Sequence, residues 1–431
     1  MKSKTAFIRL RPWQELNLRM FKVIDSLGLI IQNSQMLISR DFLHTLSNTN
    51  SQEAILLWGP RQVGKTTLLD QLAPKSSLYL DDLALREASQ ADPALVLNNL
   101  ETPCLIDEAQ YAPNLFPELK LRIDKLRRNN LKTSKKRNTF YYLTGSNKLL
   151  LDEKIKESLA GRCSLYTLHG LSFKEILSYD PNLSIKSVLF RGGFPDLYTQ
   201  EDISVSKYLN DYIVSFIEKD IARTAGVQKI NEFQTVLRLL AARTGQFLNV
   251  NEIANSAGVE QKTVQSWIDL LQKNLIIELV DPYFSNLSKR ITKMKKLYFY
   301  DVGLCARLQG YHDEESLWNS PQVGSLFETM VFSEIVKTKD NFLKNWNLYT
   351  WRTKEQNEID FILQDGRRFL FIESKLGIHG VKPFELDVEA KKVFKESYQK
   401  VITSVGLKKT QLSSETLSVP ISFLGEYLKN F

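Results

Sequence analysis

The sequence predicts an α/β protein whose first domain is a parallel sheet with flanking helices. Three apolar segments of strand character predict this class, and each is followed by residues typical of a ligand site at the carboxyl end of a strand. These segments are residues 54–58, 102–108 and 139–147.

The first apolar segment runs directly into a glycine-rich loop with the spacing G-x4-G-K-T. The loop residues are Gly59, Pro60, Arg61, Gln62, Val63, Gly64, Lys65 and Thr66. The glycines let backbone N–H groups close around phosphate oxygens, Lys65 reaches the β- and γ-phosphates, and Thr66 places its hydroxyl on Mg2+. The pattern predicts a P-loop that binds ATP and Mg2+, with Thr67 in the following helix. Arg61 is another cation near the phosphates, and its role stays open.

The second apolar segment ends in two carboxylates, Asp107 and Glu108, after Pro103 has barred a helix. At the carboxyl end of a buried strand, Asp107 would hold the Mg2+ shell and Glu108 would polarise the attacking water. A strand that ends in a solvated acidic turn has the same pattern. The two acidic residues therefore indicate a catalytic site only in combination with the P-loop. Together the two motifs predict hydrolysis of ATP.

The third apolar segment ends in the small polar residues Ser146 and Asn147. Their side chains could hydrogen-bond the γ-phosphate or the attacking water. Further along the chain, Arg162 lies on a short turn after a predicted helix.

Five short motifs resemble those of a known family. They are Gly59 to Thr67, Asp107 to Gln110, Leu143 to Ser146, Ser158 to Arg162 and Gly192 to Pro195. In this respect the chain resembles AAA-type ATPases of bacteria and archaea that carry a second, C-terminal domain. The resemblance implies that Arg162 is an arginine finger or sensor arginine, and that the ATPase is a homo-oligomer if the arginine acts in trans. In the alternative interpretation, Arg162 caps a helix end or pairs with a carboxylate.

Composition fits a soluble protein of two or three domains. Of 431 residues, 43% are hydrophobic and 25% charged, and no segment has the length of apolar sequence needed to cross a membrane. Three cysteines without paired spacing favour a reduced, cytoplasmic setting, and four scattered histidines predict no zinc site. The net charge of +8 permits a polyanionic partner such as DNA without requiring one.

The motifs divide the chain into five parts. We predict a basic N-terminal extension (1–35), an ATPase core (36–165), a helical lid or connector (166–245), a winged helix (246–300) and a nuclease-like domain (301–431). The extension fits a basic amphipathic helix for a membrane, a partner or nucleic acid. It equally fits a variable extension, or a start assigned too far upstream.

The predicted winged helix consists of helices near 248–254 and 263–271 around a turn at Gly258, with wing strands at 275–280 and 296–300. The exposed side chains of its second helix lack the Arg, Lys and Asn that read bases, so protein contact or a structural role is favoured there. The wing carries a basic run suited to phosphate contacts or to a solvated face, namely Lys289, Arg290, Lys293, Lys295 and Lys296. Nine basic residues between Lys120 and Arg137 likewise fit either a solvated loop or a surface that binds polyanions.

The C-terminal part has the element order of a PD-(D/E)XK nuclease core. The predicted elements are a helix from 324, strands at 347–351, 358–363 and 368–375, a helix at 386–398 and a strand at 401–405. Glu328, Asp360 and Glu373 would hold Mg2+ or Mn2+, and Lys375 would orient or deprotonate the attacking water. Acid and lysine pairs are common on strands, so the alternative is a degenerate nuclease fold used for binding.

The sequence thus predicts an ATPase that acts on or with DNA through a nuclease-like domain. The alternative is a nucleotide-dependent switch or scaffold that binds DNA or a partner protein through an inactive nuclease fold. A simple chaperone-like ATPase would show neither DNA binding nor cleavage.

Overall fold

The computed structural model of the chain describes most of its residues. The described ranges are 37–48, 53–133, 139–146, 158–200, 202–222, 226–284, 294–353, 357–377, 383–386, 388–394 and 398–431. The predicted extension 1–35, Asn147 and the predicted wing residues Lys289, Arg290 and Lys293 lie outside them. The chain divides into a unit Met1–Ser39 and a unit Arg40–Phe431, and the second holds every element below. No helix within the described ranges is both long and apolar enough to cross a membrane.

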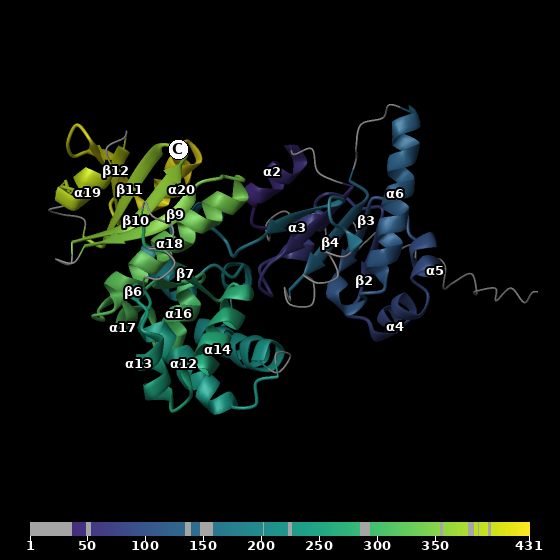
Figure 1. Cartoon of the computed structure of the whole chain (residues 1–431), viewed down its shortest axis with the longest axis horizontal. Coiled ribbons are helices and arrows are strands. Elements are labelled where there is room, and N and C mark those ends of the chain that lie inside the picture. Colours follow the sequence, from purple (N-terminus) through teal and green to yellow (C-terminus); the bar gives the residue numbers. More distant parts are fainter. Residues whose placement is uncertain are drawn as a thin grey trace, which may run out of the picture. The chain divides into compact units, whose positions relative to one another are not determined.

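The first sheet is parallel throughout, as predicted. Its strands are β1 (Ala54–Trp58), β2 (Ser76–Tyr79), β3 (Cys104–Asp107), β4 (Tyr141–Gly145) and β5 (Cys163–Thr167). They lie in the order β2-β3-β4-β1-β5, so β1 is flanked by β4 and β5 and stands next to neither β2 nor β3. Because the strands are parallel, the carboxyl ends of β1, β3 and β4 lie at one edge of the sheet. Of these strands, β3 and β4 are labelled in Figure 1.

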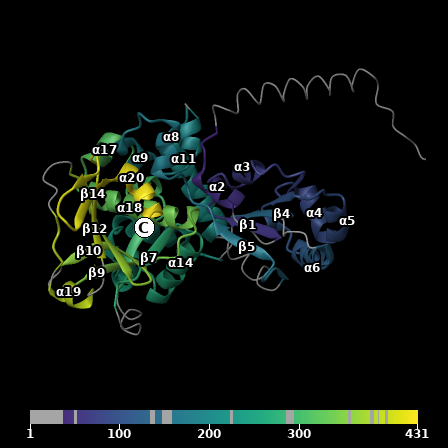
Figure 2. The same ribbon diagram turned by 90° about the horizontal axis from the view of Figure 1, so that it is seen from above.

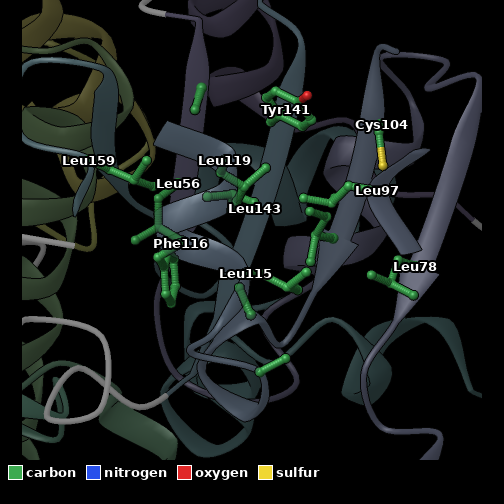
Figure 3. Close-up of a cluster of buried hydrophobic side chains, with 14 of the residues drawn as sticks. Leu56, Leu78, Leu97, Cys104, Leu115, Phe116, Leu119, Tyr141, Leu143 and Leu159 are labelled. Carbon is green, nitrogen blue, oxygen red and sulfur yellow. The ribbon is translucent and has the colours of Figure 1, made fainter. Parts of the chain in front are cut away.

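Helices accompany this sheet, and some of them contribute side chains to its core. They are α2 (Asp41–Asn48), α3 (Lys65–Asp70), α4 (Leu83–Ala91), α5 (Pro93–Asn98), the short η1 (Ala109–Tyr111) and α6 (Leu115–Thr133). The first turns of α6 bring Phe116 and Leu119 toward Leu56 of β1 and Leu143 of β4 (Figure 3). All four side chains are at least 98% buried. This apolar core holds the strands in register beneath the loops that follow them.

Helices dominate the next part of the chain, as predicted. They are α8 (Phe173–Tyr179), α9 (Ile185–Arg191), α10 (Asp196–Thr199), α11 (Val205–Tyr212), the π-helix η2 (Ile213–Ala222) and α12 (Ile230–Ala242). The Gly192 to Pro195 motif lies between α9 and α10, where the Gly193 N–H donates to Asp301 Oδ2 at 2.7 Å. Asp301 also caps the N-terminus of α16 (Val302–Leu308) through the Leu304 N–H. The motif therefore ties two separate segments together.

A pair of helices and a small sheet follow. Helices α13 (Val250–Ala257) and α14 (Gln261–Lys273) flank Gly258, and β6 (Gln246–Phe247), β8 (Lys296–Phe299) and β7 (Ile277–Val280) form an antiparallel sheet. The predicted helices and strands are present, and the name winged helix stays a prediction. Of the predicted phosphate-binding lysines, Lys296 is 2% exposed and faces carboxylates, so that part of the prediction is wrong.

The C-terminal part is a mixed sheet with helices against it. After α17 (Glu314–Trp318) and α18 (Val323–Asn341) come β9 (Asn347–Arg352), β10 (Glu358–Asp365), β11 (Arg368–Lys375), α19 (Val388–Val393), β12 (Tyr398–Ser404), β13 (Thr410–Gln411), β14 (Thr416–Pro420) and α20 (Ile421–Lys429). The sheet order is β13-β14-β12-β11-β10-β9. Helices α18 and α20 pack together on it, as both views show (Figures 1 and 2).

One predicted helix in this part is too long. We expected helix over 386–398, but α19 ends at Val393 and Tyr398 already belongs to β12. Tyr398 pairs with Phe369 of β11 and its ring lies 5.3 Å from that of Phe371. Pairing with the sheet and aromatic packing therefore override the local helical pattern.

Candidate functional site

The predicted P-loop connects β1 to α3 in a conformation that depends on glycine. Gly64 has φ 86° and directly precedes α3, a backbone conformation that is strained for most other residues. At Gly59 a Cβ atom would lie 2.2 Å from the Leu168 carbonyl oxygen, so no larger residue fits. The loop can thus follow a tight path from the carboxyl end of β1 into the helix.

Lys65 is buried within this loop. Its Nζ donates to the carbonyl oxygens of Gly59 (3.1 Å) and Pro60 (2.7 Å). Burial lowers the pKa of the Lys65 ammonium from 10.5 to about 8, against the opposing effect of Glu108 and Asp107. Among the described residues the Lys65 ammonium donates to two carbonyl oxygens, and such a buried cation is well suited to meet an anion.

The two acidic residues at the end of β3 lie beside the start of α3. Thr66 and Thr144 both donate a hydroxyl hydrogen to Asp107 Oδ1, each at 2.6 Å. The Thr144 hydroxyl also accepts the backbone N–H of Glu108 at 2.8 Å. Thr66 and Asp107, predicted to share a Mg2+ ion, are therefore in direct contact.

Glu108 is held by two polar side chains. The Ser146 hydroxyl donates to Glu108 Oε2 at 2.8 Å, and the Gln110 amide donates to the same carboxylate. Glu108 has φ 51°, a left-handed conformation that is uncommon outside glycine and clusters at functional sites. The structure thus brings together Lys65, Thr66, Asp107, Glu108 and Ser146, which the sequence analysis selected from three separate segments.

Arg61 contacts aromatic side chains outside the P-loop. Its guanidinium donates to the Tyr111 hydroxyl at 2.9 Å and lies 5.8 Å from the centre of the Phe216 ring. Arg61 therefore links the loop to η1 and to η2.

The sequence analysis did not identify Arg40, whose side chain contacts the backbone of the P-loop. Arg40 is 6% exposed and donates to the carbonyl oxygens of Val63 and His169, each at 2.8 Å. It also pairs with Glu175 at 3.2 Å. A lone arginine before a helix carries no sequence signal for such contacts, because all three partners are distant along the chain.

Arg162 lies at the other end of the strands. Its carbonyl accepts the N–H of Ala54, the first residue of β1, whereas the P-loop follows the last residue of β1. At about 3.3 Å per residue, the four steps from Ala54 to Trp58 separate the two ends of β1 by roughly 13 Å. The guanidinium pairs with both Asp124 oxygens, at 2.7 and 3.0 Å. Arg162 therefore does not reach the P-loop of its own chain.

The candidate nuclease residues do converge in the C-terminal sheet. Asp360 of β10 accepts the backbone N–H and the hydroxyl of Ser374 (2.8 and 2.7 Å), while Lys375 donates to Glu373 at 3.0 Å. Burial and the neighbouring Asp360 raise the pKa of Glu373 to about 7, and the same two causes raise that of Glu328 to about 7. The carboxylates of Glu328, Asp360 and Glu373 thus form a buried acidic cluster.

Two residues that the sequence analysis did not assign to this cluster change its chemistry. Lys296 of β8 donates to Glu328 and to Glu358, and its ammonium lies 4.0 Å from Asp360. In the part of the chain that the structure describes, no group of three or more His, Cys, Asp or Glu side chains is arranged to hold a metal ion. The predicted Mg2+ or Mn2+ ligands Glu328, Asp360 and Glu373 therefore do not form a fitting metal site in this arrangement.

The P-loop residues, by contrast, fit ATP and Mg2+. A buried ammonium at the loop, the Gly64 turn into α3 and the Thr66–Asp107 contact place a cation, backbone donors and oxygen ligands at one edge of the sheet.

Comparisons with known proteins identify one domain of known type in the chain. Residues 51–177 match the family model of an AAA domain. Residues 182–315 and 323–423 match two domains of unknown function, DUF8612 and DUF4143.

Two relatives align with most of this chain, and both are named as uncharacterized proteins. The uncharacterized protein Rv2008c of Mycobacterium tuberculosis is 31% identical over 322 residues, which cover 74% of this chain and 69% of that protein. The uncharacterized protein MJ1637 of Methanocaldococcus jannaschii is 26% identical, covering 65% of this chain and 67% of that protein. Among solved structures, the Walker-type ATPase PABY2304 of Pyrococcus abyssi aligns with 15% identity and a TM-score of 0.41, over 63% of this chain and 96% of that chain.

Proposed function

This chain belongs to the AAA-domain family that includes the uncharacterized protein Rv2008c, and from that premise we propose that it hydrolyses ATP with Glu108 as the catalytic base. One observation carries the proposal: the network that joins Thr66, Asp107, Thr144, Glu108 and Ser146 at the carboxyl edge of the sheet. It sets the Glu108 carboxylate beside a loop shaped for phosphate.

Each side chain of the site has a distinct task in this proposal. Lys65 neutralises charge on the phosphates, while Thr66 and Asp107 would hold Mg2+, which supplies Lewis-acid polarisation of the phosphoryl oxygens when bound. Glu108 accepts the proton of the attacking water. Ser146 and Gln110 hold the Glu108 carboxylate at a defined position until it acts.

Nucleotide binding and phosphate release by a Lys65 variant test whether the P-loop binds ATP. Lys65→Ala should abolish nucleotide binding, measured with a fluorescent ATP analogue, and phosphate release with it. Lys75→Ala is the matched control, because Lys75 is an exposed lysine of the same domain outside the loop. Unchanged ATP binding by the Lys65 variant would contradict the proposal.

Arg162 would serve the ATPase only from a neighbouring copy. Because Arg162 lies far from the P-loop of its own chain, it would contact the nucleotide bound to a neighbouring copy. This arrangement requires a homo-oligomer. The ion pair with Asp124 supports the competing structural role.

For the C-terminal part we consider two functions. In the first, ATP hydrolysis governs access of DNA to a nuclease site at Asp360, Glu373 and Lys375. In the second, ATP controls a switch or scaffold that binds DNA or a partner protein. Lys296 within the carboxylate cluster favours the second.

Incubation of plasmid and single-stranded DNA with the purified protein separates these functions. The reactions contain Mg2+ or Mn2+, with and without ATP, beside a Glu373→Ala/Lys375→Ala control. The switch or scaffold proposal expects no cleavage, and cleavage that disappears in the control would replace it by the nuclease.

A further inference from the structure

A buried lysine stands inside the acidic cluster of the C-terminal sheet. Lys296 is the first residue of β8, and its side chain is 3% exposed. Its ammonium lies 2.7 Å from Glu328 Oε1, contacts Glu358, and is 4.0 Å from Asp360 Oδ1. Glu328 comes from α18 and the two other acids from β10, so this cation joins three separate elements.

The surroundings fix the ammonium in place. The Tyr298 hydroxyl donates to the same Glu328 oxygen at 2.5 Å, and the Lys296 ammonium lies 5.8 Å from the centre of the Tyr298 ring. A buried ammonium is unfavourable unless paired charges and hydrogen bonds compensate it. Three carboxylates supply that compensation here, so the position of Lys296 is set by the cluster itself.

Space and charge both oppose a second cation. Divalent ions bind carboxylate oxygens at about 2.0–2.6 Å. The Lys296 ammonium already contacts Glu328 and approaches Asp360, which are two of the predicted metal ligands. Two cations between the same oxygens would also repel each other strongly in a buried setting.

We propose that the Lys296 ammonium takes the place of a divalent cation at Glu328 and Asp360, and keeps this cluster closed to Mg2+ and Mn2+. The cluster is then a charged brace that holds β8 against α18 and β10. This inference does not depend on ATP hydrolysis, because none of its residues belongs to the P-loop site.

Removal of the ammonium should convert the brace into a metal site. Lys296→Met keeps an unbranched apolar chain but leaves Glu328, Glu358 and Asp360 without their cation. Buried carboxylate oxygens are the ligands that Mg2+ and Mn2+ prefer. Glu373 Oε1, which is buried and has no hydrogen-bond partner among the described residues, is a further oxygen of this cluster.

Mn2+ binding measured by electron paramagnetic resonance tests the proposal on the full chain without nucleotide. The variants are Lys296→Met, Lys296→Arg, which keeps the positive charge, and Lys295→Met, a control at a neighbouring lysine that pairs with Asp281 at 3.0 Å. Each is also prepared with Asp360→Asn, so that any ion bound at the cluster is recognised by its loss. Thermal melting establishes that each variant is folded.

We expect wild type, Lys296→Arg and Lys295→Met to bind Mn2+ equally with and without Asp360→Asn. Lys296→Met should gain one further Mn2+ ion per chain, which wild type does not bind, and lose it with Asp360→Asn. Two results would overturn the proposal: Mn2+ bound by wild type that Asp360→Asn removes, or a folded Lys296→Met without any gain. If Lys296→Met does not fold, the comparison of wild type with Asp360→Asn decides alone.

Discussion

The Thr144 hydroxyl lies 2.6 Å from Asp107 Oδ1 and joins the two acidic residues at the end of β3, because it also accepts the Glu108 N–H. Thr144 is fully buried on the neighbouring strand β4. The position of the proposed base thus depends on a hydroxyl from a different segment of the chain.

Thr144→Val should lower ATP turnover while ATP binding persists. The valine has similar volume but leaves the partly buried Glu108 N–H without its acceptor, at a cost of about 1–3 kcal/mol. If this cost destabilises the catalytically competent position of Glu108, turnover drops roughly ten- to hundredfold. Thr235→Val, on the exposed face of α12, is the control. Equal turnover of both variants would show that Thr144 does not position Glu108.

Arg40→Met should destabilise the fold and weaken nucleotide binding. The Arg40 and Glu175 side chains are 5% and 2% exposed, so removal of the cation leaves a buried carboxylate unpaired. Such a loss costs about 3–5 kcal/mol. Urea unfolding measures the change, and the double variant Arg40→Met/Glu175→Gln should regain part of it. A single variant as stable as wild type would refute this role.

ATP affinity should fall as the pH rises from about 7 to about 9. Burial lowers the pKa of Lys65 to about 8, and bound polyphosphate raises that pKa again. Between the two pKa values the complex holds more protons than the free protein, so binding takes up protons and weakens with rising pH. Calorimetry in buffers of different ionisation enthalpy measures the uptake. Proton release on binding would contradict the prediction.

Mixing two inactive variants tests Arg162 in trans. Arg162→Ala retains Glu108 but lacks the arginine, whereas Glu108→Gln retains Arg162 but lacks the base. If Arg162 acts on a neighbouring site, mixed oligomers contain complete sites and regain turnover. Asp124→Ala, which breaks the same partly exposed ion pair, should leave turnover close to wild type. No recovery on mixing would favour the structural role of Arg162.

Short sequence motifs predicted most residues of the P-loop site. The strand, loop and helix around Lys65 are contiguous, and Asp107 and Glu108 directly end an apolar strand, so chain order alone predicts their neighbourhood. The sequence pattern also predicts the helix α18 and the strands β9, β10 and β11.

Sheet order and distant partners could not be predicted in the same way. Arg162 was correctly expected on a turn, but the pairing of Ala54 with Cys163 decides which end of the sheet that turn faces. Arg40 and Lys296 look like ordinary surface cations in sequence, because their carboxylate partners lie 135 residues away for Arg40 and 32 or 62 residues away for Lys296. Burial of such charges is visible only once the fold brings the partners together.

ATP turnover by Glu108→Gln, measured beside its ATP binding, tests the central claim most directly. Glu101→Gln, an exposed glutamate just before β3, is the matched control. With Glu108 as the base, ATP binding should stay close to wild type while turnover falls by about a hundredfold or more. Turnover equal to that of wild type would contradict the assignment of Glu108 and, with it, this account of the site.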